Sequence, residues 1–137
     1  MAPRLPTFFL SHGGGPWPWV PQMAAAHAPL AAALQALPRQ LPRRPAAVLL
    51  VSAHWEAEAF TFGASAAPGM LYDYAGFPAH TYAIRYPAPG APALAERARA
   101  LVAAAGLPVA LDHARGYDHG TFVPMAVMWP DADVPVL

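Results

Sequence analysis

The stretch that decides the fold is AAVLLVSAHWE, residues Ala46–Glu56. Its first six residues, Ala46–Val51, are all apolar and rich in aliphatic side chains. Because this run is too short for a helix, it predicts a β-strand that is buried on both faces. Ser52, Ala53 and His54 follow the run. Open α/β sheets bind their ligands at the carboxyl ends of the strands, so His54 stands where a functional residue is expected.

A second stretch near the N-terminus has the same arrangement. Pro6–Leu10 is a short apolar run, and Ser11 and His12 follow it directly. If the two runs are neighbouring parallel strands, His12 and His54 meet at one edge of the sheet. Two converging imidazoles suggest a metal site, and imidazole suits zinc, iron, copper and nickel. The spacing therefore predicts a site and leaves the metal open.

The composition limits the class of protein. The 137 residues fit one domain, which we take as residues 1–137. Cysteine is absent, so any transition metal needs nitrogen or oxygen ligands. Eight arginines balance eight acidic residues without a basic cluster, so nucleic acid is not an expected partner. No apolar run approaches the about 20 residues of a membrane span, and the N-terminus lacks a signal-peptide core. We therefore expect a cytoplasmic protein without a membrane partner.

The rest of the chain alternates helical and extended patterns. Helices are predicted over Met23–Leu37, Pro92–Ala105 and Phe122–Trp129, and strands over Ala59–Ala64, Val109–Leu111 and Val134–Leu137. A strand, a helix and a strand in succession form a right-handed βαβ unit with a parallel strand pair. The pattern predicts an α/β fold with a mostly parallel sheet and helices on both faces.

Two loops supply aromatic side chains near the predicted site. Gly13–Trp19 holds three glycines, which permit either a tight turn or the close approach of a ligand. Ala67–Ala88 is long and mostly irregular, and its aromatic content argues against disorder. This loop either packs on its own aromatic rings or forms a substrate wall, and both interpretations stay open. The candidates for an aromatic pocket wall are Trp17, Tyr74, Phe77 and Tyr82.

A third histidine, His119, lies in a turn just before the short apolar helix. A neutral imidazole with a pKa near ~6.5 takes or gives a proton at working pH, which suits acid–base catalysis. Asp118 beside it is a candidate partner, although neighbours in sequence often point apart. His27, inside a predicted helix, is expected to serve packing or to lie on the surface.

Four segments of the chain resemble the class III extradiol ring-cleavage dioxygenases, and most of all their 4,5-DOPA extradiol dioxygenase branch. The segments are LSHGGGPW at residues 10–17, VLLVSAHWE at 48–56, YDYAGFPAHTYAIRYPAPGAP at 72–92 and RGYDHGTFVPMAVMWPDADVPVL at 115–137. They cover nearly the whole chain in the family's order. Taken together they are a highly specific match, whereas any one alone is not.

The resemblance implies a fold, a metal and a reaction. The fold is an α/β sandwich with a mostly parallel sheet. One metal ion per chain, Fe(II) in the active form or Zn(II), is held by the histidines that match His12 and His54. The histidine that matches His119 lies near the substrate, which implies a catalytic role. The implied reaction opens the ring of a catechol, such as DOPA, and inserts both atoms of O₂.

Members of that family are longer than this chain, which resembles their N-terminal half. Their second half supplies the remaining metal ligand and a catalytic histidine, and Val134–Leu137 reads as a strand cut short at the C-terminal edge of an incomplete sheet. We therefore expect weak metal affinity, poor solubility through association with other chains into oligomers, and little ring cleavage from these residues alone. Should turnover be sustained, the residues that could supply a further ligand are His80, His113, Asp73 and Asp118.

Two other functions are compatible with the same residues. A zinc hydrolase on a similar frame would use the same two histidines to activate a metal-bound water. A truncated, non-catalytic chain would bind metal or another protein without redox chemistry. Reaction with a catechol and O₂ under reducing conditions separates these possibilities. The natural catechol and the position of ring cleavage stay open.

Overall fold

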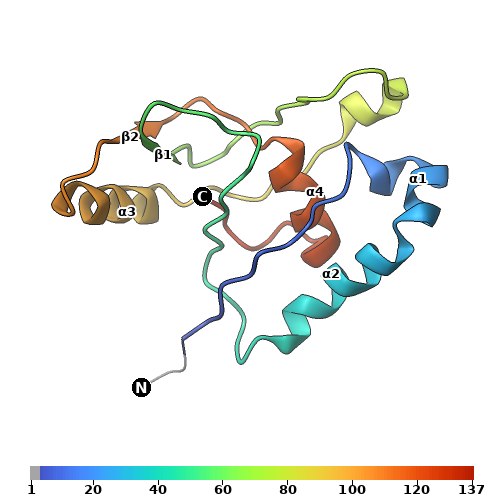
Figure 1. The fold of residues 1–137 in the computed structure, drawn as a ribbon, viewed down its shortest axis with the longest axis horizontal. Coiled ribbons are helices and arrows are strands. Elements are labelled where there is room, and N and C mark those ends of the chain that lie inside the picture. The colour runs from blue at the N-terminus through green and yellow to red at the C-terminus, as the bar shows by residue number, and fades with distance from the viewer. Residues whose placement is uncertain (1–3) are drawn as a thin grey trace.

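Helices and parallel strands alternate along the chain in the computed structural model, which describes residues 4–137 (Figure 1). The helices are α1 Pro21–Ala26, α2 Ala28–Gln40, α3 Pro92–Ala104 and α4 His119–Met128; the strands are β1 Phe60–Gly63 and β2 Val109–Asp112; short 3₁₀ turns are Trp17–Trp19 and Ala79–Ala83. In Figure 1, α3 and the strands lie at one end, α1 and α2 at the other, and α4 between them. The predicted α/β class is confirmed. Within the described residues, no helix is long and apolar enough to cross a membrane.

The strands β1 and β2 form a parallel pair in which Phe60 lies opposite Val109 and Gly63 opposite Asp112. The helix α3 precedes β2 and packs against both strands. Its predicted ends are confirmed to within one residue: Pro92 lies in the first turn, and Gly106 follows the helix with φ 76°. Proline at the start and a left-handed glycine after the end are the usual helix boundaries.

The stretch Ala46–Val51 pairs with the C-terminal residues, but it is not buried on both faces as predicted. Val48 donates its N–H to the carbonyl of Pro135 (2.8 Å), and Leu50 donates to Leu137 (2.8 Å), in parallel pairing. Val48 and Leu50 pack on the core, whereas Leu49 and Val51 are 59% and 90% exposed. Successive strand side chains point to opposite faces, and the described part of the chain covers only one of them.

The predicted strand Pro6–Leu10 does not form. Its residues are extended without any strand pairing, and Phe9 is fully exposed. The backbone groups of a strand need hydrogen-bond partners. The predicted partner of this run, Ala46–Val51, pairs with the C-terminal residues instead. The predicted βαβ unit between these two runs is therefore wrong.

The helix predicted over Met23–Leu37 is longer and divided at His27. The helix α2 begins just after this residue, with Pro29 in its first turn. Because proline has no backbone N–H to donate to the preceding turn, the hydrogen bonds of α1 do not continue into α2. The His27 ring stacks on Trp17 with centroids 5.1 Å apart. A packing role for His27 is confirmed.

The helix α4 begins three residues before the predicted Phe122. Asp118 caps it, because its side chain accepts a hydrogen bond from the Thr121 N–H (3.0 Å). A capping aspartate satisfies a donor that the first helical turn leaves free. His119 is therefore the first helical residue rather than part of the preceding turn. Every residue from His119 to Met125 is buried, so α4 is the centre of the core.

Truncation of Phe122 should strongly destabilise the fold. Its side chain is fully buried and its ring lies 5.9 Å from that of Trp19 and 6.4 Å from that of Tyr72. We expect Phe122→Ala to lower the free energy of unfolding by about 3–5 kcal/mol in urea titrations, because it leaves a cavity. The control Leu101→Ala, on the 65% exposed Leu101, should cost within about 0.5 kcal/mol. Equal effects of the two changes would contradict the packing described.

Candidate metal centre

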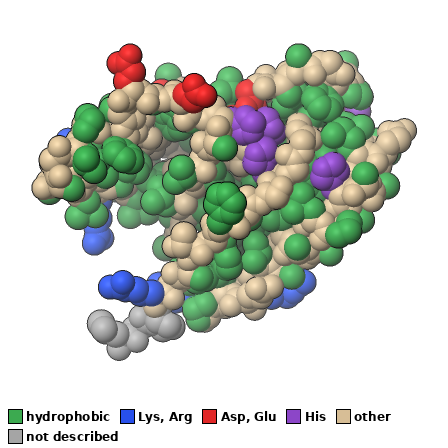
Figure 2. Space-filling model, in the orientation of Figure 1, with side chains coloured by type: hydrophobic (Ala, Val, Ile, Leu, Met, Phe, Trp, Pro, Cys, Tyr) green, Lys and Arg blue, Asp and Glu red, His purple; other side chains and the backbone are tan. Residues whose placement is uncertain are grey.

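The side chains of His12, His54 and His119 converge at one place in the structure. Figure 2 shows histidine side chains at the surface of one face of the molecule. The Nε2 atoms of His12 and His54 lie 3.1 Å apart, and the ring of His119 is centred 4.2 Å from that of His54. One nitrogen from each of the three lies within 4.8 Å of the others. The structure thus brings together the two predicted metal ligands and the predicted catalytic histidine.

Each histidine comes from a different kind of segment. His12 ends an extended segment, His54 follows the stretch paired with the C-terminus, and His119 opens α4. The backbone of His12 is held by Trp17, whose indole Nε1–H donates to the His12 carbonyl (2.7 Å). Gly13 has φ 76°, and a Cβ there would lie 2.5 Å from the same indole nitrogen. Glycine therefore permits both the turn after His12 and the approach of Trp17.

The carboxylate of Asp73 orients His119. Its Oδ1 accepts hydrogen bonds from the backbone N–H of His119 (3.0 Å) and from its ring Nδ1 (2.7 Å), while Oδ2 lies 3.7 Å from Nδ1 of His54. Burial tends to raise the pKa of Asp73, but the two hydrogen bonds from His119 outweigh it and lower the pKa. The carboxylate is therefore ionised at neutral pH and leaves Nε2 of His119 for other chemistry.

The ring of His12 is suited to metal binding. Among the described residues its buried Nδ1 has no hydrogen-bond partner. Burial lowers the pKa of His12, and the neighbouring His119 and His54 lower it further. A metal binds only the neutral imidazole, so His12 is in the competent form at neutral pH. Nitrogen donors from three imidazoles fit a divalent transition ion such as iron or zinc.

Comparison with known proteins identifies the family. Residues 6–137 match the family of the catalytic LigB subunit of aromatic ring-opening dioxygenase. The chain belongs to the LigB family.

The chain is also similar to two curated relatives and to a solved structure. The chain is 42% identical to the dioxygenase tasH of Hapsidospora irregularis in an alignment 142 positions long, which covers 96% of this chain and 42% of that protein. It is 40% identical to the 4,5-DOPA dioxygenase extradiol of Portulaca grandiflora in an alignment 133 positions long, which covers 95% of this chain and 47% of that protein. A crystal structure of an uncharacterized protein from Escherichia coli K12 has 41% identity and a TM-score of 0.53, covering 77% of this chain and 37% of that one. The chain therefore spans about half the length of these curated relatives.

The aromatic residues predicted to wall the pocket of this LigB-family chain fall into two groups. The ring of Tyr74 lies 5.8 Å from that of His119, and Phe77 and Tyr82 lie 5.4 and 5.3 Å from Tyr74. Trp17, in contrast, is 2% exposed and lies behind His12. Tyr74, Phe77 and Tyr82 thus adjoin the histidines, whereas Trp17 supports one of them from within the core. Contact of any of the four with a substrate stays a prediction.

The long irregular loop does pack on its own aromatic rings. The hydroxyl of Tyr74 donates to the carbonyl of Thr81 (2.6 Å), and that of Tyr72 donates to Ile84 (2.6 Å). Burial raises the pKa of Tyr74 to about 12. Its hydroxyl therefore stays protonated at neutral pH and keeps its hydrogen bond within the loop.

The sequence identified Asp118 as the candidate partner of His119, and the structure shows Asp73 in that place. Asp118 turns toward Ser52, Arg115 and Thr121 instead. An N-capping side chain points back along the first helical turn, away from the next residue's ring. Asp73 lies in an irregular loop, where the only signal was an acidic residue between two tyrosines. His80 and His113 are not in the group of possible metal ligands found among residues 4–137.

Replacement of Asp73 should weaken metal binding. Asp73→Asn keeps the size but removes the carboxylate charge that lies 3.7 Å from Nδ1 of His54, one of the two predicted metal ligands. We expect Zn(II) affinity to fall about 10–100-fold, as is typical when a carboxylate beside a ligating histidine is lost. Competition with a chromogenic chelator measures it. Asp133→Asn, which affects only an exposed pair with Arg44, is the matched control. Equal Zn(II) affinity of the two variants would rule out a role for Asp73 in metal binding.

Proposed function

We propose that the three-histidine site is the metal centre of an extradiol dioxygenase that opens the ring of a catechol and inserts both atoms of O₂. The observation that carries the proposal is the convergence of His12, His54 and His119 in a chain of the LigB family. The relative named 4,5-DOPA dioxygenase extradiol supports a catechol such as DOPA as substrate. The proposed partners are this small molecule and O₂, with one Fe(II) or Zn(II) per chain and Fe(II) as the active ion.

In this proposal His12 and His54 hold the ion, and His119 acts on the substrate. When bound, ferrous iron supplies a Lewis acid for the catechol oxygens and a redox centre for O₂. Nδ1 of His119 donates to Asp73, so Nε2 is the nitrogen that accepts a proton from a catechol hydroxyl. The ionised Asp73 then stabilises the charged imidazole.

The cluster of Tyr74, Phe77 and Tyr82 would receive the catechol ring. Aromatic faces bind a planar ring by stacking or edge contacts. The Tyr74 hydroxyl is already bonded to Thr81, so Tyr74 contributes its ring and not a base. His119 is therefore the group beside this cluster that is suited to move a proton.

A chromogenic catechol tests the substrate class without requiring turnover. A nitrocatechol should bind the metal-loaded chain, and its absorption band should shift to that of the deprotonated form, because adjacent oxygens can both reach the ion. The matched nitroresorcinol, whose hydroxyls are not adjacent, should give no such shift. Equal responses to the two compounds, or none, would contradict the proposal and favour a hydrolase or a non-catalytic protein.

We expect slow ring cleavage from residues 1–137 alone. The chain spans about half of its relatives' length. The expectation that further site residues lie in the other half of these proteins supports this prediction. The assay mixes the chain with Fe(II), ascorbate and DOPA and records O₂ consumption and the yellow semialdehyde. Sustained turnover by a monomer would overturn this expectation and show that residues 1–137 hold a complete site.

A further inference from the structure

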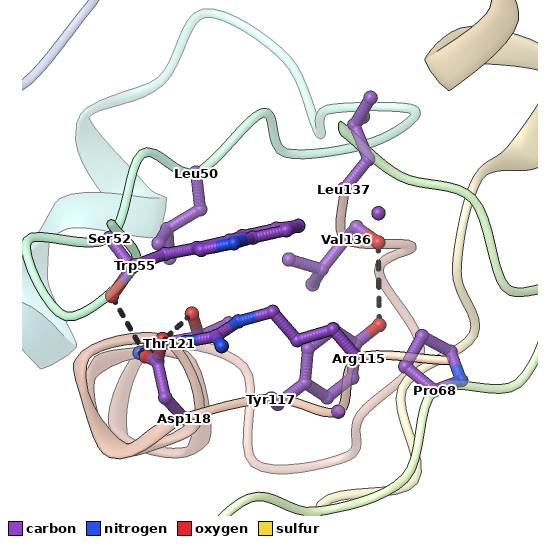
Figure 3. Close-up of a pocket in the computed structure, with 12 residues that line it drawn as sticks. Leu50, Ser52, Trp55, Pro68, Arg115, Tyr117, Asp118, Thr121, Val136 and Leu137 are labelled. Carbon is purple, nitrogen blue, oxygen red and sulfur yellow. Dashed lines mark hydrogen bonds and ion pairs between the residues drawn. The ribbon is translucent and has the colours of Figure 1, made fainter. Parts of the chain in front are cut away.

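The loop that carries His54 is tied to the start of α4 by side chains that lie outside the three-histidine group (Figure 3). Asp118, only 2% exposed, is at the centre of this network. Its Oδ1 accepts a hydrogen bond from the Ser52 hydroxyl (2.8 Å), and its Oδ2 accepts one from Nη2 of Arg115 (3.0 Å). Thr121 adds its N–H and hydroxyl to Oδ1. A buried carboxylate is tolerated only when it is satisfied in this way.

Both arms of the network end on the backbone of His54. The Ser52 hydroxyl oxygen accepts a hydrogen bond from the His54 N–H (3.1 Å), and Arg115 Nη2 donates to the His54 carbonyl (3.2 Å). The N–H and the carbonyl of one residue are therefore held by two side chains that a single buried carboxylate joins. Such a double attachment restricts the backbone rotation that would move the imidazole.

A glycine lets the loop approach α4 closely enough for these contacts. A Cβ on Gly120 would lie 2.8 Å from Cδ2 of His54 and 2.9 Å from the Ser52 hydroxyl. Both distances are shorter than non-bonded contacts allow, so a larger residue would push the loop away. Because Gly120 and His119 directly follow Asp118, the network also sets the spacing between the rings of His54 and His119.

Contacts with Asp112 and Trp55 orient Arg115, which bonds to His54. Its backbone N–H donates to Oδ1 of Asp112 (2.8 Å), and its guanidinium lies 4.6 Å from the centre of the Trp55 ring. Figure 3 shows Trp55 above Arg115 beside the small cavity that both line. A cation–π contact of this kind restricts the long Arg115 side chain in advance. Less side-chain entropy is therefore lost when Arg115 bonds to the His54 carbonyl.

We propose that Ser52, Asp118 and Arg115 are positioning residues that hold the His54 imidazole in place for metal binding. This inference rests on the proposed function, in which His54 is a metal ligand. None of the three is among the possible ligands found in the described residues. A purely structural network would alter stability without altering the geometry of the bound ion, and this difference makes the role testable.

The test uses Co(II) alone as the probe, because its visible d–d bands report ligand geometry. Ser52→Ala, which removes the hydroxyl that joins Asp118 to His54, should weaken Co(II) binding about 10-fold or more and change the bands. Ser52→Thr keeps a hydroxyl and should restore both. The control Arg99→Ala affects only an exposed pair with Glu96 on α3 and should change neither. Unaltered affinity and bands in Ser52→Ala, or equal losses in the alanine and threonine variants, would overturn the proposal.

Amide hydrogen exchange of the metal-free chain separates failure of this proposal from failure of the proposed function. If the wild-type chain binds no Co(II), or if His54→Ala binds it as tightly as the wild type, the metal site itself is wrong. The positioning role of the network is then tested only by the exchange rate of the His54 amide. Faster exchange of this amide in Ser52→Ala than in Ser52→Thr or Arg99→Ala supports the positioning of His54, and unchanged exchange overturns it.

Discussion

Replacing both His12 and His54 by alanine should abolish stoichiometric metal binding. Two of the three converging imidazoles are removed, and their Nε2 atoms lie only 3.1 Å apart. The loss should exceed the about 10–100-fold that follows removal of a ligand's hydrogen-bond partner, because the donor atoms themselves disappear. Metal content after anaerobic loading with Fe(II) or Zn(II), followed by desalting, is the measurement.

The matched control for this experiment is His113→Ala. His113 is exposed and lies outside the group of possible ligands in the described residues, so its loss tests for adventitious binding by surface histidines. The control should retain wild-type metal content. If the double variant also retained it, the assignment of His12 and His54 as ligands would be wrong, and the proposed function would lose its metal centre.

The local elements of the fold could be predicted because their signals are local. Pro92 and Gly106 mark the ends of α3, and the short apolar runs around Phe62 and Val109 become β1 and β2. The start of α4 was missed because His119 and Gly120 are typical of a turn. The N-cap hydrogen bond from Thr121 to Asp118 extends the helix to His119 nonetheless.

The meeting of His12 and His54 was predicted, but not the way in which it is achieved. The prediction assumed two paired strands, whereas Pro6–Leu10 is unpaired in the structure. The two histidines are held instead by contacts of their loops, from Trp17 on one side and from Ser52 and Arg115 on the other. A similar outcome thus followed from a different physical cause.

The supporting residues could not be predicted because their partners are distant in sequence. Asp73 and His119 are 46 positions apart, and Ser52 and Asp118 are 66 apart. Neither separation leaves a periodic pattern, and Asp73 lies in a loop without regular structure. Adjacency in sequence favoured Asp118 as the partner of His119, but the direction of a capping side chain removes it from that role.

His119→Ala should reduce turnover far more than metal occupancy. Nδ1 of His119 is bonded to Asp73, which leaves Nε2 beside the aromatic cluster around Tyr74 to act on the substrate. Loss of a positioned acid–base group typically lowers the rate about 10²–10⁴-fold. We expect a fall of this size while His12 and His54 keep the ion. Oxygen uptake and metal content are measured on the same preparations of a polypeptide that contains residues 1–137 and turns over a catechol.

His119→Gln sharpens the same experiment, because glutamine can still donate a hydrogen bond to Asp73 but does not transfer a proton at neutral pH. It should retain metal and lose turnover as the alanine variant does. The geometry also allows a third ligand, since a nitrogen of His119 lies within 4.8 Å of the other two. Parallel loss of metal and turnover in both variants would therefore make His119 a ligand. Loss of neither would leave it a buried structural residue at the start of α4 and would remove the proton-transfer step from the proposed function.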